Sequence, residues 1–331
     1  MFKLSICIPT FNRAHLLLVT LESIISQIRF IESDDVQIVI SDNNSDDDTE
    51  IICSRLIEKF NNKGDKIIYN KNERNLADKN FEIALSLGTG AFLKLNNDTL
   101  AHVSGSLDSM LNLLSENSTG EPILFFSNGK EYLDEKINGQ NFNSFLRNAG
   151  GLVTFTGAFG IWREHFKKIN DFSRRANLKL PHTDCLFRNF DMSATYCICN
   201  KKLFIIQDPG KKGGYDIITV FMENYIFLLR EKLQEGLLSK EVFERERKAV
   251  LIDMVRPWML NIIFYPELYT FTCKNATSRI FKCYSDNLIW ISYFMLRLSF
   301  SFFLYATKMS IKMLLPVFIL KRIRNACFSS R

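Results

Sequence analysis

The first hundred residues alternate between short apolar runs and longer segments in which apolar side chains recur every three or four positions. The apolar runs are residues 3–8, 36–41, 66–70 and 91–95, and the segments between them are residues 13–28, 46–60 and 76–87. Short apolar runs are typical of buried strands, and a spacing of three or four is typical of helices. The alternation therefore predicts an α/β fold, with a mostly parallel, Rossmann-like sheet and helices on both faces.

Polar segments follow all four predicted strands. They are PTFNR, SDNNSDDDT, NKNERN and NNDT. Ligands of parallel sheets bind beyond the carboxyl ends of the strands, so we expect the functional side chains to converge at this edge. PTFNR lacks the glycines of a dinucleotide-binding loop, and this excludes a Rossmann dinucleotide site at the first strand.

The second half of the chain has a less regular pattern. It predicts a helix at 104–115, a strand at 122–126, a long polar loop at 127–151, a strand at 154–162, a helical piece containing Asp184, a strand pair at 195–199 and 203–207, a Gly-rich loop at 208–216 and long helices to about residue 273. We therefore expect one domain over residues 1–215, a helical extension over 216–275 and a separate tail over 276–331.

The tail differs from the body in charge. Residues 281–331 carry eight Lys or Arg and one Asp, whereas the rest of the chain has a net charge of −1. The uncharged run 298–307 is shorter than the ~20 residues of a spanning helix. The polar residues that would share one stripe of a helix are Asp286, Arg297, Ser301, Lys308 and Lys312. This pattern favours an amphipathic helix in the plane of an anionic membrane surface, with a core-packed helix or a dimer seam as alternatives.

Composition excludes several other kinds of site. The eight cysteines form no C-x-x-C pair and the four histidines show no ligand spacing, so we expect no zinc site and a reduced compartment. The N-terminus begins with strand-like residues rather than a signal peptide. The body has no Lys- and Arg-rich run with interleaved aromatics, so nucleic acid is not an expected partner.

Asp42 is the first candidate ligand contact, because it stands directly at the end of the second predicted strand. The acids that follow it, Asp46–Thr49, fit better as a turn and cap of the next helix. A solvated turn over the whole of 42–49 is the alternative for Asp42.

The segments SICIPTFNR, IVISDNNSDDDTE and NKNERNLADKNFEIALSLGTGAFLKLNNDT resemble the N-terminal half of family 2 glycosyltransferases, over roughly residues 3–100. These enzymes have the GT-A fold. The segments NLADKNF and GGYDIITVFMENY further resemble abequosyltransferase-like enzymes of O-antigen assembly. The resemblance implies a nucleotide-binding half over 1–100 and an acceptor half over 101–215.

The resemblance also implies site residues. Those expected around the nucleotide are Pro9, Thr10, Asn12, Arg13, Asp42, Asn72, Arg74 and Lys79, with Asp78 orienting Lys79. Where the family has D-x-D for manganese or magnesium, this chain has Asn96-Asn97-Asp98, so Asp98 alone would contact a divalent metal in a weakened site. The positive charges of Lys211 and Lys212 are the alternative to a metal. A UDP-sugar is the default donor, and a CDP-sugar remains open.

Asp184 is the implied catalytic base, because it would lie in the first turn of a helix marked by Pro181 and Thr183. A carboxylate that only complements the helix dipole is the alternative. The residues expected to line the donor sugar or the acceptor are Asn96, Asn97, Gly157, Ala158, His182, Lys211 and Lys212.

The function that follows is an inverting glycosyltransferase that extends a lipid-linked glycan for O-antigen or capsular polysaccharide, as a peripheral protein at the cytoplasmic face of a bacterial inner membrane. A nucleotidyltransferase would need a Gly-rich, basic loop after the first strand, and PTFNR is not such a loop. The other alternative is a non-catalytic nucleotide-sugar-binding or membrane-associated protein on the same scaffold.

Overall fold

A computed structural model describes residues 2–61, 65–210 and 212–314. Its central sheet has the strand order β3-β2-β1-β4-β8. The strands are β1 (Leu4–Thr10), β2 (Val36–Asp42), β3 (Ile67–Lys71), β4 (Phe92–Leu95) and β8 (Gly160–Trp162). The first four are parallel, as predicted, and β8 is antiparallel to β4. The carboxyl ends of the four parallel strands therefore share one edge.

Alternate residues of the central strands face two different hydrophobic clusters. In β1, Ile6 and Ile8 belong to one cluster and Cys7 to the other. In β2, Ile40 belongs to the cluster of Ile6, and Val39 belongs to the cluster of Cys7. Burial on both faces explains why these strands are continuous apolar runs. The elements between them are α1 (Ala14–Ile25), α2 (Ile28–Glu32), α3 (Thr49–Phe60), the 3₁₀ turn η1 (Ala77–Lys79) and α4 (Asn80–Ser86).

A second, three-stranded sheet has the order β6-β9-β7. After β4 the elements are β5 (Leu100–His102), α5 (Ser106–Glu116), β6 (Ile123–Phe126), β7 (Lys136–Gln140), α6 (Phe142–Ala149), and the 3₁₀ turns η2 (Gly150–Thr154) and η3 (Thr156–Ala158). The prediction of a loop at 127–151 is therefore wrong over β7 and α6. The predicted strand at 154–162 is reduced to β8, because two tight turns occupy its first half.

The next elements are α7 (Arg163–Lys168), η4 (Phe172–Leu178), α8 (Pro181–Asn189), β9 (Thr195–Cys199) and β10 (Phe204–Ile206). The predicted pairing of 195–199 with 203–207 is wrong. β9 instead pairs with β6 and β7, and β10 pairs with β5. Both runs find partners far away in sequence, which local pattern does not reveal.

The helical extension begins with a strand. β11 (Lys212–Asp216) pairs in parallel with β12 (Tyr269–Thr272), so the predicted Gly-rich loop is ordered as a strand from Lys212. Lys211 lies outside the described residues. Between the two strands are the π-helical η5 (Ile218–Asn224), α9 (Tyr225–Gln234), α10 (Lys240–Ala249), the π-helical η6 (Val250–Val255) and α11 (Arg256–Phe264).

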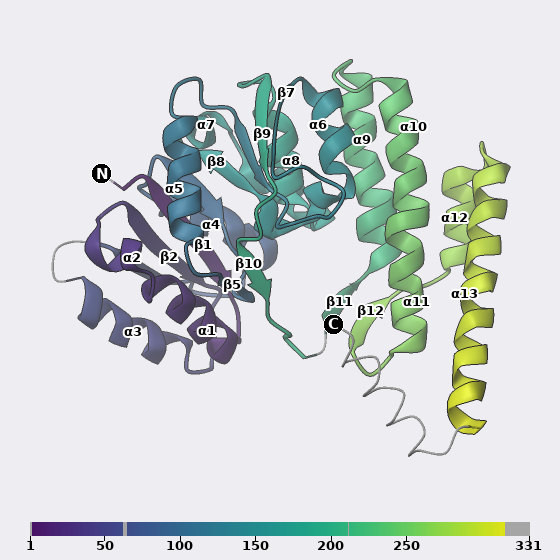
Figure 1. Ribbon diagram of the computed structural model, residues 1–331, viewed down its shortest axis with the longest axis horizontal. Helices are drawn as coiled ribbons and strands as arrows, with labels where there is room; N and C mark the ends of the chain where they lie inside the picture. The colour runs from purple at the N-terminus through teal and green to yellow at the C-terminus, as the bar shows by residue number, and fades with distance from the viewer. Residues whose placement is uncertain (1, 62–64, 211, 315–331) are drawn as a thin grey trace.

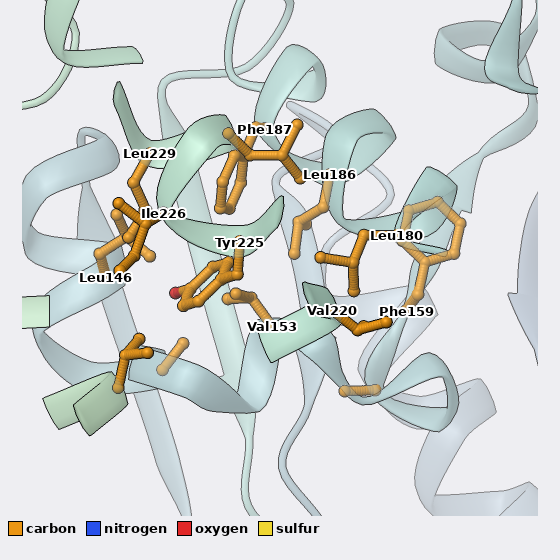
Figure 2. Packing of buried hydrophobic residues seen from close by; sticks show 14 of the residues in the cluster. Leu146, Val153, Phe159, Leu180, Leu186, Phe187, Val220, Tyr225, Ile226 and Leu229 are labelled. Carbon is orange, nitrogen blue, oxygen red and sulfur yellow. The ribbon is translucent and has the colours of Figure 1, made fainter. Parts of the chain in front are cut away.

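The extension shares its core with residues 101–215. Figure 2 shows Val220, Tyr225, Ile226 and Leu229 of the extension among side chains of α8, η2 and α6, close to Phe187. All belong to one hydrophobic cluster. The extension is thus packed firmly against the sheets, and in Figure 1 its helices (green) stand between them and the last helix.

The tail helices are α12 (Ala276–Tyr284) and α13 (Leu288–Leu314). Ile291 and Phe294 are buried, and Phe264 of α11 stacks on Tyr305, so one face of α13 packs on the body. The remaining surface is apolar and exposed: Leu288, Ile289, Leu296, Phe300, Phe303 and Leu304. The prediction that the tail is too short to span a membrane is wrong, because Leu288–Lys308 is long and apolar enough by length and composition. The mode of membrane contact stays a prediction.

Candidate active site

The ends of β1 and β4 are joined by the carboxylate of Asp98. The hydroxyl Oγ1 of Thr10 donates to Oδ2 of Asp98 at 3.0 Å, and Nη1 of Arg13 donates to Oδ1 at 3.1 Å. Burial raises the pKa of Asp98, which is 3% exposed, and the adjacent Arg13 guanidinium and the Thr10 hydrogen bond oppose that rise. The Arg13 side chain is 49% exposed, so a cation at the edge of the sheet is held ready for an anionic ligand.

The first two loops at this edge are tied together. The amide of Asn12 donates to Oγ of Ser45, and the amide of Asp46 donates to Oδ1 of Asn12. The amide of Ala14, at the start of α1, donates to Oδ2 of Asp47. Helix α1 therefore takes its N-terminal carboxylate from the second loop, 33 residues later.

Asp42 ends β2 beside Thr10, its register partner in β1. Its carboxylate is fully buried: Oδ2 accepts from the hydroxyl of Tyr69 at 2.7 Å, and Oδ1 accepts from the amide of Ser45 at 2.9 Å. Burial and this hydrogen bond raise the pKa of the Tyr69 hydroxyl. Asp42 lies at the predicted place, but in this conformation it orders the loop rather than facing solvent.

The segment after β3 is organised by asparagines. The amide nitrogen of Asn72 donates to Oδ1 of Asn80 at 2.8 Å, and Oδ1 of Asn43 accepts from the amide of Leu76. This network presents Arg74 and Lys79, both exposed, near the edge of the sheet. The prediction that Asp78 orients Lys79 is wrong, because Asp78 pairs with Lys179 at 3.4 Å.

A cavity of ≈ 650 Å³ has Asn97, the residue before Asp98, in its lining. Its other walls come from residues 127–132, from the turns η2 and η3, and from the helical extension. Strand β11 contributes Tyr215, and the extension contributes further aromatic and polar side chains: Phe221, Glu246, Asp253, Trp258 and Asn261. Aromatic faces with a few polar groups suit a sugar, which has both apolar and hydroxyl-bearing sides.

Several residues predicted to line the donor or acceptor instead support the wall of this cavity. Asn96, Ala158 and His182 are buried, and Oδ1 of Asn96 lies 3.3 Å from Nε2 of His102. Nε2 of His182 donates to the carbonyl of Thr154, and burial lowers the pKa of His182 to about 4, so this imidazole is neutral. Only Asn97 of this predicted group, among the described residues, lines the cavity itself.

Gly157 has a steric role. A Cβ at this position would lie 2.3 Å from Cδ1 of Leu100, and its carbonyl accepts from Nζ of Lys94 at 2.6 Å. Lys94 is fully buried above the rings of Phe126 and Phe204, and burial lowers its pKa to about 7. Lys94 thus fastens the turn η3 to β4, directly before the Asn96-Asn97-Asp98 triplet.

Asp184 lies in the first turn of α8, as predicted. Arg174 forms a bidentate contact with its carboxylate, with Nη2 2.7 Å from Oδ1 and Nε 2.9 Å from Oδ2. A second arginine, Arg188, places its Nε 3.0 Å from Oδ2. The carboxylate is 2% exposed and lines neither the first cavity nor a second one of ≈ 790 Å³ beside it. Its neighbour Thr183 donates to the carbonyl of Val153, in the turn that forms the cavity wall.

Glu246 and Asp253 are the cavity carboxylates that sequence reasoning missed. Glu246 is buried, its Oε2 has no hydrogen-bond partner among the described residues, and burial raises its pKa to about 7. No local motif marks either residue. The π-helical turn η6, which carries Asp253, is the one structural sign, since such turns are frequent at functional sites.

A divalent metal would find the carboxylate of Asp98 after β4, whereas the carboxylate of Asp42, at the end of β2, already accepts from Ser45 and Tyr69. No group of three or more His, Cys, Asp and Glu side chains in the described ranges could hold a metal ion. An oxygen ligand of this type fits Mn²⁺ or Mg²⁺, which take further oxygens from phosphates and water. The fit is therefore to a weak site that needs a bound diphosphate, because Arg13 already neutralises Asp98.

Comparison with known proteins identifies relatives. A family model described as Glycosyl transferase family 2 matches residues 5–193. The abequosyltransferase RfbV of Salmonella typhimurium is 26% identical over 288 residues, 78% of this chain and 83% of that protein. GalNAc(5)-diNAcBac-PP-undecaprenol beta-1,3-glucosyltransferase of Campylobacter jejuni is 31% identical over 116 residues, 34% of this chain and 35% of that protein.

Among solved structures, the mannosyltransferase PcManGT of Pyrobaculum calidifontis, in complex with GDP-Man and Mn²⁺, has a TM-score of 0.56. The sequences are 17% identical, and the match covers 78% of this chain and 72% of that one. At this identity the likeness concerns the fold, and it confirms the predicted GT-A architecture.

Proposed function

Because the chain belongs to glycosyl transferase family 2, we propose that it transfers a sugar from a nucleotide-sugar to a polyprenyl-diphosphate-linked glycan, with inversion at the anomeric carbon. The observation that carries this proposal is the meeting of Thr10, Arg13 and Asp98 at the strand ends, where Asn97, the residue before Asp98, lines the first cavity. The alternatives, a UDP- and a CDP-sugar, both present a diphosphate that needs positive charge.

The donor occupies the edge formed by the loops after β1, β2 and β3. Arg13 and the exposed Arg74 and Lys79 offer positive charge to the donor's phosphates, and the loop built on Asp42 and Asn72 shapes the space for the base. Asp98 would hold Mn²⁺ or Mg²⁺ together with the donor, and the metal, when bound, would neutralise charge on the leaving diphosphate.

The acceptor occupies the first cavity. Trp258 and Phe221 offer ring faces to a glycan, and Asn97, Asp253 and Asn261 offer hydrogen-bonding groups. The acceptor hydroxyl must lose its proton in the transition state. Asp184 is the proposed base. For this role Arg174 and Arg188 must release its carboxylate when substrate binds, and the carboxylate, which lines neither cavity, must then reach the acceptor.

The membrane is the proposed location of the acceptor. The C. jejuni relative is named for a substrate with diphosphate-linked undecaprenol, and the apolar exposed face of α13 supplies a surface for a bilayer. We assign the protein to the cytoplasmic face of a bacterial inner membrane, because nucleotide-sugars are made in the cytoplasm. An O-antigen or capsule repeat is the proposed product class.

The test is a panel of UDP-, CDP-, GDP- and dTDP-sugars, with and without MnCl₂, measured first by thermal shift and then by donor turnover. One nucleotide should raise the unfolding temperature. Arg13→Gln should abolish that rise, whereas Arg55→Gln, an exposed arginine of α3, should retain it. Binding without any turnover or transfer would favour the non-catalytic alternative, and no binding by any nucleotide would refute the proposal.

A further inference from the structure

The second cavity, of ≈ 790 Å³, adjoins the first. The two share part of their lining: Tyr132, Gly151, Glu246, Ala249 and Asp253. The two cavities therefore meet at Glu246 and Asp253, and the second extends from there along Arg245 and Lys248 of α10. The donor site does not use this space.

Positive charge lines the second cavity. Arg147 of α6 and Arg245 and Lys248 of α10 contribute to its walls, and all three are exposed. Arg147 pairs with Glu241 at 2.9 Å, and Nη2 of Arg245 donates to the carbonyl of Arg147. Lys248 has no acidic partner among the described residues.

The acids of the second cavity are Glu246 and Asp253, both on the side shared with the first cavity. Arg147, Arg245 and Lys248 line the second cavity alone, whereas both acids also line the first. An extended acceptor with a neutral glycan at one end and an anionic group further along matches this order of charges.

The outer wall of the second cavity is the beginning of α13. Ile289, Trp290 and Tyr293 line the cavity, and the helix then continues with exposed apolar side chains. In Figure 1, α13 (yellow) lies alongside α11 and α12 at the edge opposite the N-terminus. An anionic group bound by Arg245 and Lys248 would therefore lie directly beside the surface that suits a hydrocarbon chain.

We propose that the second cavity binds the diphosphate of a polyprenyl-diphosphate-linked acceptor, through Arg147, Arg245 and Lys248. The glycan extends past Glu246 into the first cavity, and the prenyl chain leaves along α13. This inference rests on the proposed function and adds the residues that recognise the lipid end of its acceptor.

The experiment measures binding to the full chain in neutral detergent micelles. The probes are farnesyl diphosphate, farnesol, inorganic diphosphate and phosphatidylglycerol, and the readouts are calorimetry and tryptophan fluorescence, since Trp290 lines the cavity. The wild-type chain should bind farnesyl diphosphate at least tenfold more tightly than any of the other three. The double variant Arg245→Gln/Lys248→Gln should lose at least tenfold of that affinity.

Two control variants test whether the affinity belongs to the second cavity. Lys240→Gln/Lys282→Gln removes two exposed charges outside the cavity, from α10 and α12, and should change the affinity less than twofold. Arg13→Gln should also leave the affinity for farnesyl diphosphate unchanged, because Arg13 belongs to the proposed donor site and its loss weakens diphosphate binding only there. Melting curves verify that each variant is folded.

Unchanged affinity in Arg245→Gln/Lys248→Gln would overturn the inference, as would equal binding of inorganic diphosphate or phosphatidylglycerol. Loss of affinity only in Arg13→Gln would assign the probe to the donor site and overturn it as well. If no nucleotide-sugar binds but farnesyl diphosphate binds as expected, the proposed function is refuted, and the second cavity is still a binding site for lipid diphosphates.

Discussion

The hydroxyl of Thr10 donates a 3.0 Å hydrogen bond to Oδ2 of Asp98, across 88 positions of sequence. Thr10 ends β1, and Asp98 follows the neighbouring strand β4. With Arg13 on the other carboxylate oxygen, the strand ends form a charged pair next to Asn97, which lines the first cavity. This contact is the centre of the proposed donor site.

Asp98→Asn should lower turnover about a hundredfold, because electrostatic groups at a leaving diphosphate contribute on that scale. Turnover of the wild-type chain should rise with MnCl₂ only at millimolar concentration and fall on treatment with EDTA, since one carboxylate holds a metal weakly. In the Asn variant, the residual rate should be independent of MnCl₂. A variant that keeps its metal response would place the metal elsewhere.

Asp184→Asn should abolish transfer while nucleotide affinity stays within twofold. The substitution also weakens the contact with Arg174 and Arg188, and breaking a buried ion pair costs roughly 3–5 kcal/mol of unfolding free energy. Rates must therefore be expressed per folded molecule, with the folded fraction taken from denaturant unfolding.

Arg174→Gln is the matched variant for Asp184. It removes one of the two ion pairs of Asp184 and retains the carboxylate and its pair with Arg188, so a catalytic Asp184 predicts substantial activity in this variant and none in Asp184→Asn. Equal residual activities in the two variants would show that Asp184 only anchors α8.

Glu246→Gln should raise stability at neutral and alkaline pH. The pKa of Glu246 is raised by burial to about 7 from an ordinary 4.5, so the folded state holds a proton that the unfolded state releases between these values. Its contribution to stability is fully present below pH 4.5 and is lost as pH rises to 7, by at most about 3 kcal/mol.

The measurement for Glu246 is the free energy of urea unfolding from about pH 4 to about pH 8, a range that brackets both pKa values. The difference between Glu246→Gln and wild type should grow over this window and then stay level. A flat difference would mean that the carboxyl of Glu246 is solvated in the folded protein.

Leu296→Asp/Phe303→Asp should abolish co-flotation with liposomes, because two exposed apolar side chains of α13 become charged. Ser299→Asp, an exposed polar position of the same helix, should still float, and nucleotide binding should be unchanged in both variants. Flotation of the double variant would remove α13 from the proposed membrane contact.

The strand ends could be predicted from sequence because each strand and its polar successor are adjacent in the chain. Thr10, Asp42 and Asp98 lie at the same edge, as expected. Their contacts could not be predicted from local pattern: Asp42 orders its own loop through Ser45 and Tyr69, and Asp78 finds Lys179 rather than Lys79.

The cavity was missed because its walls come from distant segments. In sequence, Glu246 and Trp258 look like ordinary helix residues. They line a cavity only because η2 and residues 127–132 pack opposite them in the fold. The helix α6 could have been predicted from sequence, because Phe142, Phe145, Leu146 and Ala149 have helical spacing; all four are buried. The many polar residues of the segment 127–151 obscured this helical spacing.

The pairing of β11 with β12 joins the two ends of the segment that carries α9, α10 and α11. Arg279 reinforces the join, with Nη1 2.8 Å from Oδ1 of Asp216. A closed segment of this kind cannot unravel from one end. The helices α10 and α11, which line the first cavity, are therefore anchored at both ends of one continuous stretch of chain.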